Sequence, residues 1–354
     1  MNIKNTICTL SLLVSLCPCC PVISFSQPTA LTAKELMEHP SLKEHVQELY
    51  DGEIVLLNQP ERESASQLDV LMLVMVPTQM DKTVKTLQGQ ATGADSSGTL
   101  ANGEFKSSTP GAIDQALTPV MFANDELPEV EKMLTIDAGD TFNFSRDEIK
   151  LIREKAENLT DAESDGAAAL EAMSEAMREL LKGRYLAYRK NGMAGLAPYQ
   201  FSSSKQVSPS AELIAATEDL HLIKERFPDY YACLRYYPEK MLPTLVHRYF
   251  WVKQTESGRP LFVLKHWILD IQSDYALITE RRYYLNHSLS SLQIVIGCLP
   301  HDDSTLVVLL NQAFTEKVNM KIGQTIAKAI GHREVEKNIR PIFENLRIAL
   351  SGDP

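Results

Sequence analysis

Five runs in the last third of the chain are apolar or alternate between apolar and polar positions, and each has the length of a β-strand. They begin near residues 245, 261, 275, 292 and 305, and only short polar segments separate them. Connections this short join antiparallel neighbours, so the pattern predicts an antiparallel sheet over residues 244–313. In the second run both sets of alternating positions are largely apolar. This indicates a sheet that is covered on both faces or that encloses an apolar cavity on one of them.

The N-terminal third alternates between helical and strand patterns. Apolar spacing predicts a helix over residues 31–50, with Thr32 as its N-cap. Two apolar runs, 52–59 and 68–77, predict a pair of strands, and a short helix is expected over 78–88.

Residues 89–111 consist mainly of Gly, Ser, Thr and Ala. This composition predicts a long flexible loop, and such a loop can act as a lid over a site.

The middle of the chain predicts a helical insertion over about residues 112–230. Ser145 and Glu148 have the spacing of a capping box at the start of a helical stretch that extends to residue 190. Gly192 suits the left-handed position that ends a helix. Residues 201–210 predict a polar linker, and 211–227 predict a further helix. One face of the long helix is apolar: Leu170, Met173, Met177, Leu180, Leu181 and Tyr185.

A helical period continues over residues 320–350 after the last strand, and Gly331 and Pro341 are expected to bend this C-terminal helix. Together these elements predict one α+β domain over residues 27–354, in which an antiparallel β-sheet packs against a long bent C-terminal helix and carries a large helical insertion.

The N-terminus predicts a signal peptide over residues 1–26. Lys4 precedes an apolar stretch over residues 7–17 that is too short to cross a bilayer, and small residues, Ser24 and Ser26, precede Gln27. We expect a periplasmic or secreted protein with no integral membrane segment after removal of the signal. The alternative is a short membrane anchor that is retained.

Removal of the signal leaves two of the six cysteines, Cys233 and Cys298. Thiols in an oxidising compartment can pair as a disulfide. Both residues also have apolar surroundings, in which a free cysteine packs as a small hydrophobic residue. The sequence leaves the two states open.

The formal net charge is −11, and residues 121–180 carry most of it, with 16 acidic side chains against 6 basic ones. Nucleic-acid binding needs a basic surface, so this partner class is not expected. The eight histidines show no metal-ligand spacing, and no nucleotide-binding or nucleophile motif is present. We therefore predict no metal and no cofactor; catalytic activity and any protein partner stay open.

Charged and aromatic residues interrupt the apolar strands and are candidate ligand-binding residues. His266 is the central candidate, because Leu264 and Ile268 flank it on one face and would place it in an apolar cavity. The alternative is that the charged residues mark a solvated face or edge of the sheet. The strand candidates are His247, Trp251, His266, Trp267, Asp270, Glu280 and Arg282, and Lys265 and Arg281 interrupt the same strands.

A second candidate region lies at the end of the long predicted helix. Arg184 and Tyr188 are one helical turn apart, as are Tyr185 and Arg189, and Tyr199 follows the glycine-containing elbow after residue 191. These residues could form a polar and aromatic wall that holds an anionic head group. The alternative is that the segment only terminates the helix.

The order of elements resembles the START-like helix-grip superfamily over residues 53–88 and 244–350. The resemblance implies a curved sheet that wraps the terminal helix and leaves an apolar cavity, although about 150 residues separate the two matching segments. The chain also resembles uncharacterised secreted bacterial proteins. We expect an exported protein that binds a hydrophobic or amphipathic small molecule, including lipids. An envelope enzyme that uses strand histidines and carboxylates is one alternative, and a structural or interaction protein of the envelope is another.

Overall fold

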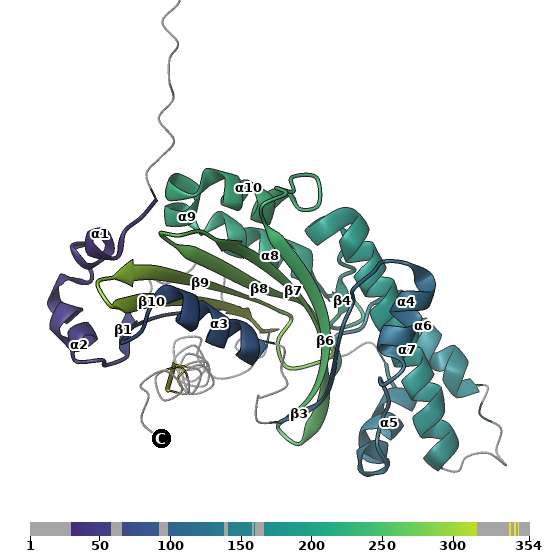
Figure 1. Cartoon of the computed structure of the whole chain (residues 1–354). Coiled ribbons are helices and arrows are strands. Elements are labelled where there is room, and N and C mark those ends of the chain that lie inside the picture. Colours follow the sequence, from purple (N-terminus) through teal and green to yellow (C-terminus); the bar gives the residue numbers. More distant parts are fainter. Residues whose placement is uncertain are drawn as a thin grey trace, which may run out of the picture.

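The computed structural model describes residues 30–57, 66–91, 98–137, 141–157, 159, 166–316, 340, 343, 344 and 346. Within these residues the chain forms an eight-stranded antiparallel sheet with the order β1-β2-β10-β9-β8-β7-β6-β3 (Figure 1). The strands are β1 Val55–Leu57, β2 Gln67–Val76, β3 Thr99–Glu104, β6 Val246–Glu256, β7 Arg259–Ile271, β8 Ala276–Leu285, β9 Ser291–His301 and β10 Ser304–Phe314.

The predicted antiparallel run in the last third is confirmed: β6 to β10 lie side by side in chain order. Ser257 and Gly258 connect β6 to β7, and both have positive φ, the backbone conformation that suits a tight hairpin between twisted strands. The two predicted early strands also pair, and β2 lies along β10, the last strand. The strand pair that comes early in the chain therefore lies next to the strand that comes last in the chain.

One face of the sheet is covered by the helical block, by which we mean helices α4 to α10 (Figure 1). The longest, α7, begins with Gly166 and ends with Asn191, and the predicted apolar face of this helix is buried. The predicted capping box also forms: the backbone N–H of Ser145 donates to the Glu148 carboxylate at 2.6 Å. The block contains α4 Pro110–Leu117, α5 Leu127–Leu134, α6 Arg146–Glu157, α7 Gly166–Asn191, α8 Pro209–Glu218, α9 His221–Arg226 and α10 Pro228–Tyr236.

The opposite face of the sheet carries α3 Met80–Ala91, and we call it the α3 face (Figure 1). Val84 and Leu87 of α3 pack on the apolar side chains of β2, β9 and β10, and so do Phe343 and Leu346. These two C-terminal residues are helical and buried. The remainder of the predicted C-terminal helix lies outside the described residues.

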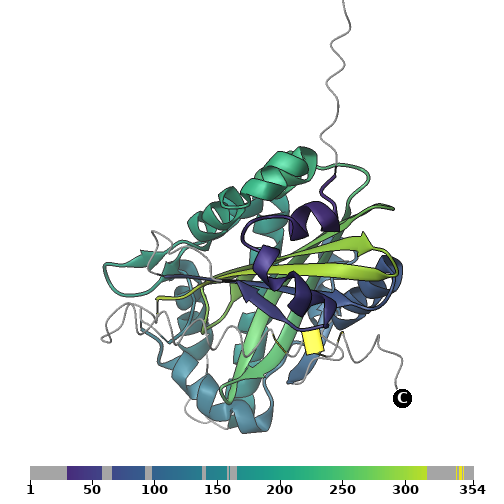
Figure 2. The same cartoon turned by 90° about the vertical axis from the view of Figure 1, so that its left-hand side faces the viewer.

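The predicted helix over residues 31–50 is wrong in extent. The segment forms two short helices, α1 Ala33–Met37 and α2 Val46–Tyr50, separated by a turn and a short 3-10 segment. Pro40 explains the break, because the residue before a proline disfavours the helical conformation. Thr32 does cap α1 as expected. In Figure 2, α1 and α2, coloured purple, lie in front of the edge of the sheet.

The predicted flexible loop over residues 89–111 is also wrong in part. Helix α3 extends to Ala91, β3 pairs with β6, and α4 begins at Pro110; residues 92–97 lie outside the described part. The strand forms there because Gly103 lets the backbone of β3 lie directly against the indole of Trp251, where any Cβ would overlap the ring.

The predicted linker over residues 201–210 is shorter than expected. Strands β4 Tyr199–Gln200 and β5 Gln206–Val207 form a small hairpin, and α8 begins at Pro209 with Ser208 as its N-cap. The single helix expected over 211–227 is two helices, α8 and α9.

The predicted signal peptide lies outside the described residues. In the part of the chain that the structure describes, no helix is both long and apolar enough to cross a membrane.

The disulfide between Cys233 and Cys298 does not form, and both thiols are free and buried. Cys233 lies on α10, in the core between the helical block and the sheet, whereas Cys298 points to the α3 face. The sheet separates the two sulfur atoms, so the alternative of two small buried hydrophobic residues applies.

Candidate functional site

The predicted strand residues divide between the two faces of the sheet. Leu264, His266 and Ile268 do share a face, but it is the face that the helical block covers. Trp267 points to the α3 face, and Glu280 accepts a hydrogen bond from its indole at 2.7 Å. The prediction that His266 lines a cavity beside the C-terminal helix is therefore wrong, since alternation along a strand cannot show which helices cover a face.

Five polar side chains on the block-covered face form a continuous row across the sheet. Each is the register partner of the next on the neighbouring strand, and all are buried. Hydrogen bonds connect the middle of the row: Gln293 donates to Gln312 at 3.2 Å, and Gln312 donates to the carbonyl of Ala216 on α8 at 3.0 Å. We call these residues the polar row: His266 on β7, Arg281 on β8, Gln293 on β9, Gln312 on β10 and Asp69 on β2.

Arg281 is the second residue of this row, between His266 and Gln293, and its side chain is fully buried. Its guanidinium donates to Gln293 at 3.0 Å, to the Thr217 hydroxyl at 3.2 Å and to the Leu234 carbonyl at 3.1 Å. Among the described residues no carboxylate lies within 4.0 Å of it. A buried charge is costly unless other groups compensate for the loss of water. Here neutral hydrogen-bond acceptors on α8, α10 and β9 solvate the guanidinium.

A chain of hydrogen bonds continues from the row toward the edge of the helical block. The Tyr188 hydroxyl lies 2.8 Å from Nδ1 of His266, and Nε2 of His266 lies 2.9 Å from Nδ1 of His247. The ring of Tyr249 stacks on His266 with 4.3 Å between centroids. Two predicted candidates, His247 and His266, are thus brought together, and Tyr188 joins them from α7.

The environment keeps these groups in their neutral forms. Burial, followed by the positive charge of Arg189, lowers the pKa of His247 to about 4. Burial, followed by the charges of His247, Arg281 and Arg189, lowers the pKa of His266 well below its usual value. Burial also raises the pKa of Tyr188 to about 12, so this hydroxyl keeps its proton at neutral pH.

The stability of the protein should therefore decrease in mild acid, and His247→Gln should weaken this dependence. An unfolded histidine binds a proton below about pH 6.5, whereas folded His247 does so only near pH 4, so the unfolded state takes up more protons between these values. We expect the wild type to lose up to about 1.4 kcal/mol more stability per pH unit than the variant between pH 6 and 5. Urea denaturation at each pH measures the difference; parallel curves would contradict a neutral, buried His247.

Arg184 and Tyr199 do not form an open wall. Arg184 is buried, pairs with Glu148 on α6 at 2.6 Å, and lies over the rings of Tyr199 and Tyr284, at 4.9 and 4.4 Å from their centroids. Burial raises the pKa of Tyr199 above its usual range. Arg184 and Tyr199 therefore do not line a head-group site, because these side chains join α7 to α6 and to the sheet.

Asp270 and Trp251 do not line a cavity, and both form hydrogen bonds within the fold. Asp270 accepts hydrogen bonds from Tyr275 at 2.9 Å and from Gln272 at 2.7 Å, near the turn after β7. The indole of Trp251 donates to the carbonyl of Ala116 on α4 at 2.8 Å and packs in the core of the helical block.

A second group of charges lies on the α3 face. Glu280 accepts from Arg282 at 2.6 Å and lies 3.6 Å from the ammonium of Lys265. Burial alone would raise the pKa of Glu280, but Lys265 and Arg282 lower it to about 2. Burial outweighs the attraction of Glu280 for Lys265 and lowers the pKa of that amine to about 8. Trp267, Lys265 and Arg282 thus surround Glu280 in one cluster, in which a single carboxylate pairs with two cations.

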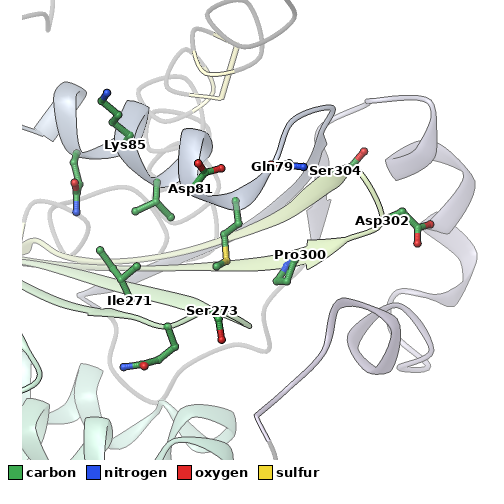
Figure 3. Close-up of a pocket in the computed structure, with 12 residues that line it drawn as sticks. Gln79, Asp81, Lys85, Ile271, Ser273, Pro300, Asp302 and Ser304 are labelled. Carbon is green, nitrogen blue, oxygen red and sulfur yellow. The ribbon is translucent and has the colours of Figure 1, made fainter.

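An open groove of about 750 Å³ lies on the same face, between α3 and the ends of β7 and β9 (Figure 3). Met80, Val84, Ile271 and Pro300 supply its apolar surface. The sequence did not indicate this groove, because its walls come from segments far apart in the chain. Its polar and charged lining residues are Gln79, Asp81, Lys85, Gln88, Gln272, Ser273, Asp302 and Ser304.

Comparison with known proteins identifies no family. No family model and no curated protein matches the chain. Among solved structures, one entitled "Crystal structure of Ara h 8.0201" matches at 12% identity and a TM-score of 0.21, over 30% of this chain and 67% of that one. Similarity at this level assigns neither fold family nor function.

Proposed function

We propose that the protein is exported and binds a hydrophobic or amphipathic small molecule in the groove between α3 and the sheet. The observation that carries the proposal is the shape and lining of the groove: about 750 Å³, with an apolar surface and polar groups around it. Sites for small molecules typically combine a concave apolar surface with a few polar groups that orient the ligand. Export rests on the N-terminal pattern of the sequence.

The order and pairing of the elements support a helix-grip arrangement. Strand β2, helix α3 and strand β3 precede the helical block, strands β6 to β10 follow it, and β2 pairs with β10. Helical residues near the C-terminus, Phe343 and Leu346, pack on the α3 face. In a helix-grip fold the ligand lies on the face that the terminal helix covers, and this is the face that carries the groove.

The charges of the groove favour an uncharged ligand. Its lining contains one basic residue, Lys85, and two acidic residues, Asp81 and Asp302. The other charges on this face belong to the cluster around Glu280, where one carboxylate already pairs with the two cations Lys265 and Arg282. We therefore favour a neutral hydrophobic or amphipathic molecule.

Ile271→Asp should weaken binding of the uncharged probe N-phenyl-1-naphthylamine at least tenfold, or about 1.4 kcal/mol. Ile271 is 45% exposed and belongs to the lining, so the substitution puts a carboxylate against the apolar part of the ligand at little cost to the fold. Fluorescence titration measures the affinity.

The matched control is Leu222→Asp on α9, which is 44% exposed and lies on the opposite side of the sheet. It should bind the probe like the wild type. The proposal fails if the wild type shows no saturable binding at micromolar concentrations, or if both substitutions weaken binding equally.

A further inference from the structure

Two buried nitrogen atoms at the edge of the helical block have no hydrogen-bond partner among the described residues: Nε2 of His247 and Nε of Arg189. His247 is the second residue of β6, and Arg189 lies in the last turn of α7. Both side chains are partly exposed at other atoms, so the place where α7 meets β6 is open to solvent on one side.

The hydrogen-bond chain determines the direction in which its protons point. Arg281 can only donate, so the oxygen of Tyr188 accepts from it, at 3.4 Å. Among the described residues the hydrogen of Tyr188 has one acceptor, Nδ1 of His266, so Tyr188 donates to that nitrogen. Neutral His266 then carries its hydrogen on Nε2 and donates it to Nδ1 of His247. Neutral His247 must therefore carry its hydrogen on Nε2. The hydrogen-bond chain therefore ends at the Nε2–H group of His247, which has no acceptor among the described residues.

The charge around this donor is positive. Arg281 is fully buried, Arg189 lies 4.3 Å above the ring of Tyr249 and donates to Tyr185, and neither forms an ion pair with a carboxylate of the described residues. The same charges oppose protonation of His247 and His266. Unsatisfied donors in a positive, partly desolvated place favour an anionic acceptor.

We propose that His247 and Arg189 bind a small oxyanion group, a carboxylate or a phosphate, where α7 meets β6. The anion accepts from Nε2 of His247 and from Nε of Arg189. Tyr237 borders the site: its ring lies 5.7 Å from that of His247, and its hydroxyl is fixed by Tyr249 at 2.7 Å. The site lies on the opposite face of the sheet from the groove and does not depend on it.

The test uses protein labelled with ¹⁵N in its histidine side chains, titrated at constant ionic strength with acetate, inorganic phosphate and decanoate. We expect a saturable shift of the His247 and His266 resonances in the wild type. Arg189→Gln should weaken the affinity at least tenfold. Lys190→Gln, which removes the same charge from an exposed neighbour, should leave it unchanged.

Binding of acetate or phosphate would identify a site for free small anions, and binding of decanoate alone would identify a site for the acidic head of a larger molecule; both outcomes support the proposal. It is overturned if no anion gives a saturable shift up to about 100 mM, an affinity too weak for a site, or if Arg189→Gln binds as well as the wild type. If Arg189→Gln does not fold, His247→Phe is the second variant, followed through the His266 resonances. Ile271→Asp should retain anion binding, which separates this site from the groove.

Discussion

Gly192→Ala should destabilise the protein by about 3 kcal/mol, and urea denaturation will measure it. Gly192 follows α7 with φ +59°, a conformation that costs an alanine about 1 kcal/mol. A Cβ at this position would also overlap the backbone carbonyl of Tyr237. Backbone cannot rotate away as a side chain can, so we add about 2 kcal/mol, a typical cost of overpacking.

Substitutions at two other glycines separate the backbone contribution from the contribution of the steric overlap. Gly258 has φ +76°, and no atom lies within 4 Å of the position that a Cβ would take, so Gly258→Ala should cost only the backbone part, about 1 kcal/mol. Gly183 lies within α7 with open space around it, so Gly183→Ala should be neutral or stabilise by up to about 1 kcal/mol. Equal losses for Gly192→Ala and Gly258→Ala would show that the contact with Tyr237 relaxes without cost.

The two contributions at Gly192 also show how far the sequence alone could lead. That a helix ends there follows from local pattern: the apolar face of α7 stops, and a glycine follows Asn191. The contact with Tyr237 does not, because that residue lies after α10 and comes near only when the segment after α10 packs against the end of α7. Local periods predicted the long helix and the antiparallel strands for the same reason, since each depends on residues close in the chain.

Strand β3 could not be predicted in this way. Its sequence is poor in the residues that favour strands, and its pairing partner β6 lies some 150 residues later. The glycine that suggested a flexible loop, Gly103, is the residue that lets the strand approach Trp251. A glycine is typical of a flexible loop, but here Gly103 is required by the packing of β3 against Trp251, which the local sequence does not show.

The candidate site was predicted only in fragments. Alternation identified Leu264, His266 and Ile268 as sharing a face, but the helices that cover that face come from the middle of the chain. The polar row could not be predicted, because it depends on the register of five strands and its glutamines appear in the sequence as single polar residues within apolar runs.

An irregularity between β7 and β8 near Leu264 also changes the alternation of side chains along the strand. As a result Tyr283 and Tyr284 both contact α7 or its neighbours.

Arg281→Met should destabilise the protein by about 4 kcal/mol. Two effects oppose each other: removing a buried charge favours the folded state, and losing its hydrogen bonds disfavours it. The second effect should dominate, because the guanidinium serves acceptors on three elements that cannot turn toward water. Gln293 is held by Gln312, and the Leu234 carbonyl is part of the backbone of α10. An unsatisfied buried acceptor costs about 1–3 kcal/mol.

Arg281→Lys should recover little of this loss, because an ammonium group cannot reproduce the planar set of donors that reaches Thr217, Leu234 and Gln293 together. Arg235→Met is the control: this arginine pairs with the exposed Glu218, so its loss should cost less than about 1 kcal/mol. Thermal and urea unfolding measure all three variants. If Arg281→Met is as stable as Arg235→Met, the polar row does not hold the helical block on the sheet. The hydrogen-bond chain from Arg281 through Tyr188 and His266 to His247 would then have no firmly held donor at its first position.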